Sequence, residues 1–80
     1  MSFIWKPEKN EWLKRNRDIS FEQVLTALVA GGFRGVLEYR GSRKVHQRQK
    51  ILLVEIDGEL WKVPHSINGD YLLLRTVYPA

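Results

Sequence analysis

Four residues toward the C-terminal end of the chain carry side chains that could act on a phosphodiester: Lys62, His65, Arg75 and Tyr78. Cleavage of RNA by its own 2′-hydroxyl needs a base for that hydroxyl, an acid for the departing 5′-oxygen and fixed positive charge for the phosphorane. Lys62 and Arg75 would supply the charge, while His65, Tyr78 or His46 would move protons. Three of them also have a structural explanation: Lys62 and Arg75 because Lys and Arg on a sheet are usually solvated, and His65 because alternation places it toward the core.

Positive charge is concentrated in residues 33–50, where six Lys or Arg stand against Glu38 alone, a net charge of +5. Residues 1–32 carry +1 and residues 51–80 carry −2. Such a local excess is expected where a protein contacts phosphates or an acidic partner, although a solvated loop is the alternative. The predicted RNA-binding residues are Arg40, Arg43, Lys44, His46 and Arg48.

Length and composition exclude several classes of protein. The 80 residues make one small domain, 1–80, and without cysteine there is neither a disulfide framework nor a thiolate zinc site. The chain has no Gly-rich phosphate loop and no Gly-x-Ser-x-Gly motif, and its two histidines stand without a carboxylate cluster. We therefore expect no metal and no cofactor. No segment approaches a membrane span or a signal peptide, so a cytoplasmic protein is expected.

The sheet that would position the four residues is indicated by two turn signals, Asp57-Gly58 and Asn68-Gly69. Both dipeptides favour two-residue type I′ hairpins, so residues 51–78 should form an antiparallel meander. An Asn68-Gly69 turn places Lys62 opposite Arg75, with two cations side by side. The Asp57-Gly58 turn places Leu53 opposite Lys62 and Glu55 diagonally beside Lys62 on the same face.

Alternation divides this meander into two faces. The apolar face should carry the core and comprises Leu52, Val54, Trp61, Val63, Leu72 and Leu74. The other face sets Lys62 and Arg75 among apolar neighbours, namely Leu53, Leu60, Leu73 and Val77. Apolar surface with charges set into it is typical of interfaces, so we expect a partner protein to cover this face.

The N-terminal half predicts a strand at 3–5, a polar helix over 7–16 and a second helix that starts at Ser20 and stops at Gly31-Gly32. Ser20 and Gln23 form a capping box, flanked by a hydrophobic staple of Ile19 and Val24. Five residues at helical spacing should cover the apolar face of the meander: Phe21, Val24, Leu25, Leu28 and Val29.

A further strand is predicted over residues 33–40, followed by a basic loop over 41–49. The order is thus strand, helix, helix and four strands, which predicts an α+β fold with two N-terminal helices packed on one face of a small antiparallel sheet. Five cations could form a basic strip along the first helix, although Glu8 and Glu11 make a solvated helix the simpler explanation: Lys6, Lys9, Lys14, Arg15 and Arg17.

Residues 3–10 (FIWKPEKN) followed by 19–22 (ISFE) resemble the start of BrnT-type ribonuclease toxins, in which Phe-x-Trp-x-x-x-Lys-Asn leads to Ser-Phe-Glu. Residues 49–51 (QKI), 63–64 (VP) and 74–79 (LRTVYP) resemble a branch of small toxin-like proteins related to that group. The order of several weak motifs, rather than one strong motif, carries the resemblance over most of the chain.

The resemblance implies a RelE-like fold and a metal-independent endoribonuclease of a type II toxin-antitoxin system, which cleaves RNA and inhibits growth. It also implies a cognate antitoxin, which would be a small DNA-binding protein. The expected assembly is a heteromeric toxin-antitoxin complex or a homo-oligomer of the toxin. Members of that branch continue past the final proline with a basic tail, whereas this sequence ends at Ala80, so weaker activity is expected here.

Two other functions fit the same residues. One is a non-catalytic nucleic-acid-binding module, which exposed aromatic side chains on a basic surface would favour. The other is an interaction domain whose basic loop meets an acidic protein, which a dimer without RNA affinity would favour.

Overall fold

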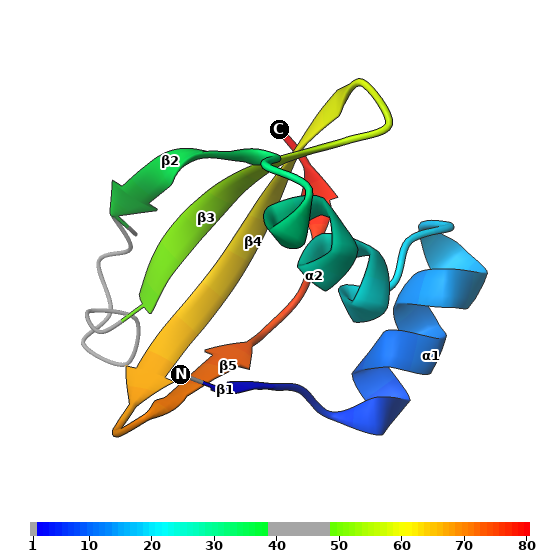
Figure 1. The fold of residues 1–80 in the computed structure, drawn as a ribbon. Coiled ribbons are helices and arrows are strands. Elements are labelled where there is room, and N and C mark those ends of the chain that lie inside the picture. The colour runs from blue at the N-terminus through cyan, green and yellow to red at the C-terminus, as the bar shows by residue number, and fades with distance from the viewer. Residues whose placement is uncertain (1, 39–48) are drawn as a thin grey trace.

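Two helices lie against one face of a curved, six-stranded sheet in the computed structural model, which describes residues 2–38 and 49–80 (Figure 1). The elements are, in chain order, β1 (Ser2–Ile4), α1 (Pro7–Asn16), α2 (Phe21–Val29), β2 (Phe33–Glu38), β3 (Gln49–Ile56), β4 (Glu59–Asn68), β5 (Tyr71–Leu74) and β6 (Tyr78–Pro79). The predicted α+β class is confirmed. A loop was expected over residues 41–49. Residues 41–48 lie outside the described residues, and Gln49 already belongs to β3.

Both helices begin and end where their local residues dictate. Pro7 occupies the first turn of α1, where its missing N–H costs no hydrogen bond. At the start of α2 the Ser20 hydroxyl accepts a hydrogen bond from the Gln23 amide at 3.2 Å, as the capping box predicts. The helix closes with amides of Gly31 and Gly32 donating to Leu28 and Ala27, and Gly31 has φ +91°. This Schellman arrangement requires a residue that tolerates positive φ.

Asn10 joins the two helices in a way that the sequence pattern did not indicate. Its buried side-chain amide donates to Glu22 Oε1 at 2.7 Å, and its Oδ1 accepts from the buried Phe21 amide at 2.8 Å. Asn10→Ala would leave the Phe21 N–H without a partner, so we expect a loss of about 1 to 3 kcal/mol in the free energy of unfolding. Urea denaturation of the two proteins measures this, and a loss below about 0.3 kcal/mol would contradict it.

One of the two predicted hairpin turns is confirmed, and the other is displaced. Asp57 and Gly58 have φ +51° and +83°, and Val54 pairs with Trp61 as expected. In the second hairpin Asn68 pairs with Tyr71, so the turn is Gly69-Asp70. Only Gly69 there has positive φ, +61°, which is the pattern of a type II′ turn with glycine first. The register of β5 is therefore shifted by two residues, which leaves each side chain on its predicted face.

Two strand pairings were not predicted. β1 runs parallel to β5, with Ile4 opposite Leu73, and β6 pairs with β4 beyond the end of β5. The sheet order is β1-β5-β4-β3-β2, so the sheet is mixed rather than purely antiparallel. The strand expected over 33–40 is described to Glu38, and its register shifts between Phe33 and Gly35.

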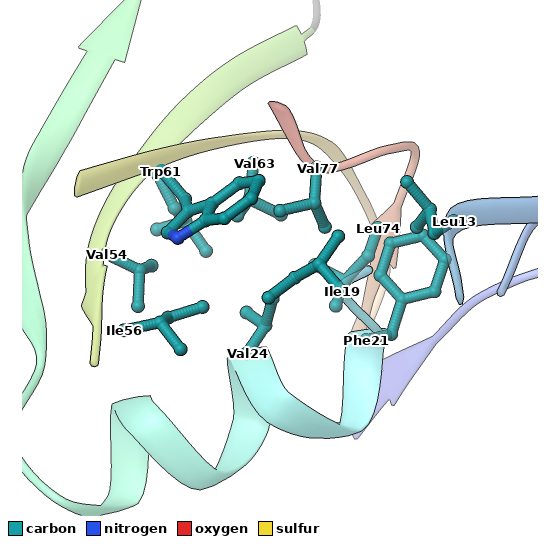
Figure 2. Packing of buried hydrophobic residues seen from close by; sticks show 11 residues of the cluster. Leu13, Ile19, Phe21, Val24, Val54, Ile56, Trp61, Val63, Leu74 and Val77 are labelled. Atoms are coloured by element: carbon teal, nitrogen blue, oxygen red, sulfur yellow. The ribbon is translucent and has the colours of Figure 1, made fainter. Parts of the chain in front are cut away.

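The core lies between the helices and the apolar sheet face, as Figure 2 shows. All six sheet residues assigned to that face are buried, and Leu13, Ile19, Phe21 and Val24 meet them from the helical side. The prediction for α2 was wrong at Val29, which is 91% exposed, while Leu28 is partly buried against the core. Val29 is the last residue of the helix and lies to one side of the stripe formed by Phe21, Val24 and Leu28, so it does not face the sheet.

Candidate functional site

Lys62 stands on the sheet face that points away from the helices, here called the outer face. Its neighbours across the strands are Leu53 on β3 and Tyr78 on β6. The prediction that Lys62 lies opposite Arg75 was wrong, because the displaced turn moves Arg75 to Pro64, whose carbonyl accepts the Arg75 amide at 2.8 Å. Lys62 therefore has a half-buried phenol beside it instead of a second cation.

Glu55 does not neutralise Lys62. Its carboxylate forms an ion pair with Arg34 at 3.4 Å, both side chains being about half exposed. Within the part of the chain that the structure describes, Lys62 forms no ion pair. A lysine without a carboxylate partner among the described residues, paired across the strands with a tyrosine, is an arrangement that can bind an oxyanion and transfer a proton.

His65 lies on the opposite face from Lys62, where it is 4% exposed. It pairs with Leu74 and Lys50 across the sheet, and its Nδ1 lies 3.3 Å from the Val63 carbonyl. The structure thus separates His65 from Lys62, in keeping with the structural alternative. Burial lowers the pKa of His65, the hydrogen bond to Val63 opposes this, and the nearby Lys50 charge adds to the lowering.

This depressed pKa predicts how stability changes with pH. Between the folded pKa of His65 and its ordinary value near 6.5, the unfolded chain binds more protons than the folded chain. The free energy of unfolding should therefore fall as the pH is lowered from 7.5 toward 5. The pKa of Glu22 is lowered chiefly by its hydrogen bond from Asn10, so that carboxylate contributes to the loss only at still lower pH.

Urea denaturation at several pH values, with wild type and His65→Gln, measures this effect. The variant should show a flatter dependence between pH 5 and 7.5, whatever its absolute stability. Equal slopes in the two proteins would contradict a buried, neutral His65.

Apart from Lys62, three cations gather where α1 meets the end of β5. Lys6, Lys9, Leu73, Leu74 and Arg75 line a hollow of about 240 Å³, here called the basic hollow. Figure 1 shows why: β1 runs beside β5 and leads directly into α1. Two of these cations were noticed in sequence only as members of a helical strip, and their meeting with Arg75 depends on the unpredicted β1–β5 pairing.

Trp12 extends this basic surface along α1. The Lys9 ammonium lies 4.0 Å from the centroid of the Trp12 ring, and the Arg17 guanidinium carbon lies 4.8 Å from it. The indole is 37% exposed. An exposed aromatic side chain among cations is the feature that favours nucleic-acid binding, since bases stack on aromatic rings and on guanidinium groups.

The outer face keeps part of its apolar surface open to solvent. Leu60 is 43% exposed, and Leu53 and Leu73 are partly exposed. Val77 was expected among them, but it is fully buried in the core. The segment that contains Val77 follows Arg75 and no longer continues the pairing of β5. Arg17 holds it against α1 by donating a hydrogen bond to the Val77 carbonyl at 2.8 Å.

The predicted RNA-binding residues Arg40, Arg43, Lys44, His46 and Arg48 lie outside the described residues. Among residues 2–38 and 49–80, no three His, Asp or Glu side chains gather where they could hold a metal ion. Over those same residues, no helix has both the length and the apolarity to cross a membrane.

Comparison with protein-family models, with curated proteins and with solved structures gives no match for this chain. The assignment of function therefore depends on the geometry of the site and on the sequence resemblance given above.

Proposed function

We propose that this chain is an RNA-binding protein of the ribonuclease-toxin type, which cleaves single-stranded RNA without a metal ion. The observation that carries the proposal is Lys62 beside Tyr78 on the open outer face. Arg75 follows directly after β5 and lies opposite Pro64, which is two residues along β4 from Lys62. The BrnT-like residue pattern of the sequence supports the same function.

The chemistry would be attack by the 2′-oxygen on the adjacent phosphorus. A solvent base takes the 2′-hydroxyl proton, the bond from phosphorus to the 5′-oxygen breaks, and the Tyr78 hydroxyl donates a proton to that departing oxygen. Lys62 stabilises the phosphorane charge, which is larger than the charge of the starting diester. The products are a 2′,3′-cyclic phosphate and a free 5′-hydroxyl.

A second candidate function, RNA binding without cleavage, is favoured by Trp12 between Lys9 and Arg17. In that case the surface along α1 holds RNA, and the outer face has no catalytic role. Detection of strand cleavage separates the two candidates.

We also propose that an antitoxin protein covers the outer face in the cytoplasm. Leu53, Leu60 and Leu73 are partly exposed there, and both described helices pack on the other face. An acidic segment with apolar residues would match this surface, since Lys62 has no ion pair among the described residues.

Induced expression in a bacterial host tests the proposed function. Growth should stop and cellular RNA should acquire new 5′-hydroxyl ends, while Lys62→Ala expressed to the same level should be tolerated. Normal growth with intact RNA, at a level of soluble protein that matches a toxic control, would count against the ribonuclease proposal.

A further inference from the structure

The basic hollow is formed by segments far apart in the sequence. The parallel pairing of Ile4 with Leu73 brings the start of α1 beside the end of β5, and Lys6 is the N-cap residue of α1. The Arg75 amide is fixed by its hydrogen bond to the Pro64 carbonyl at 2.8 Å. Both main-chain positions are thus set by the sheet, not by the charged side chains themselves.

Contacts along α1 hold the neighbouring parts of the surface in place. Lys9 rests over the Trp12 ring at 4.0 Å, a cation–π contact that limits the rotamers of the lysine. Arg17 donates to Thr76 Oγ1 at 3.2 Å and to the Val77 carbonyl, which fixes the segment directly after Arg75. These contacts therefore restrict Lys9 on α1 and the segment directly after Arg75, on either side of the hollow.

Among the residues that the structure describes, no carboxylate forms an ion pair with a cation of the hollow. The ion pairs within residues 2–38 and 49–80 are Lys14 with Glu11 and Arg34 with Glu55, and neither involves Lys6, Lys9 or Arg75. Like charges gathered at one place repel one another, and an anion between them relieves that repulsion. Leu73 and Leu74, which also line the hollow, would strengthen such an attraction by excluding some water.

We propose that the basic hollow is a phosphate-binding subsite, formed by Lys6, Lys9 and Arg75, which holds a backbone phosphate of single-stranded nucleic acid. The proposal relies on the proposed function only for the source of that phosphate. The subsite is separate from the Lys62 and Tyr78 pair, and it anchors the strand whether or not cleavage follows. Free inorganic phosphate shares the same chemistry and is the competing source.

Binding of a 2′-O-methyl oligouridine tests the subsite apart from catalysis, because this strand lacks the attacking hydroxyl. Fluorescence anisotropy at several salt concentrations gives the dissociation constant and its salt dependence. Lys6→Gln and Arg75→Gln should each weaken binding roughly tenfold, the effect of losing about 1.4 kcal/mol of charge-assisted contact. Each should also reduce the log-log salt slope by about 0.7.

Lys14→Gln is the matched control, because it removes the same charge from α1 where the lysine pairs with Glu11 at 3.4 Å. It should change the affinity less than about twofold. Melting temperatures should agree among the variants, since the Lys6 side chain makes no capping hydrogen bond and Arg75 is exposed.

Equal weakening by all three substitutions would overturn the proposal in favour of a net-charge effect, and so would wild-type affinity in Lys6→Gln and Arg75→Gln. Competition by inorganic phosphate distinguishes the sources. Displacement of the strand by phosphate at low millimolar concentration would assign the hollow to free phosphate and overturn the nucleic-acid assignment. Intact binding in the absence of RNA cleavage would overturn the catalytic proposal alone.

Discussion

Phe21→Ala should lower the free energy of unfolding by about 3 to 5 kcal/mol, as expected for truncation of a fully buried aromatic side chain. Phe21 is 0% exposed and stacks on Trp5, with ring centroids 5.4 Å apart. It also meets Leu13 and Leu74 in the cluster that holds α1, α2 and the sheet together. Its removal would therefore leave a cavity bounded by three elements.

Urea denaturation followed by circular dichroism measures the loss, and Val29→Ala on the same helix is the control. Val29 is almost fully exposed, so its truncation should change stability by less than about 0.5 kcal/mol. Because a small domain could unfold outright on losing Phe21, Phe21→Leu provides a milder variant with an intermediate effect. Similar losses for Phe21→Ala and Val29→Ala would contradict the described packing of α2.

Lys62→Ala should lower the rate of RNA cleavage between about ten- and a thousandfold, which corresponds to about 1.4 to 4 kcal/mol of transition-state stabilisation. Lys62 is the cation that lies beside the Tyr78 phenol, and it has no ion pair among the described residues. Folding should be unharmed, because a cation without an ion pair contributes little to stability.

Single-turnover cleavage of an oligoribonucleotide at saturating protein separates this loss from weaker binding. Tyr78→Phe should lower the same rate constant and leave the affinity unchanged, whereas Arg75→Ala should mainly weaken affinity through the basic hollow. Lys14→Ala is the charge control. Wild-type rates in both Lys62→Ala and Tyr78→Phe would show that the catalytic centre lies elsewhere.

The two hairpins show how far local sequence determines this fold. Asp57 and Gly58 both adopt positive φ, so their dipeptide fixed the turn and the register. At Asn68-Gly69-Asp70, glycine can take either central position, and the local pattern does not choose between them. Because the error was two residues, Leu72 and Leu74 stay on the core face in either register, and that face was predicted correctly.

The basic hollow could not be predicted from the sequence, for a different reason. It needs the parallel pairing of β1 with β5, elements separated by most of the chain, and a strand of three residues carries almost no pairing signal. Lys6 and Lys9 have the helical spacing of neighbours, but Arg75 joins them only through tertiary structure. The displaced Gly69-Asp70 turn, by contrast, is the local error that moved Arg75 away from its predicted place opposite Lys62.

The central claim is most directly tested by incubating the purified chain with an oligoribonucleotide in excess EDTA and identifying the new ends. We predict cleavage that yields 2′,3′-cyclic phosphate and 5′-hydroxyl ends, and that fails when the residue at the cut carries a 2′-O-methyl group. RNA that stays intact at saturating wild-type protein, or cleavage that is abolished by EDTA, would contradict the proposal of a metal-independent ribonuclease.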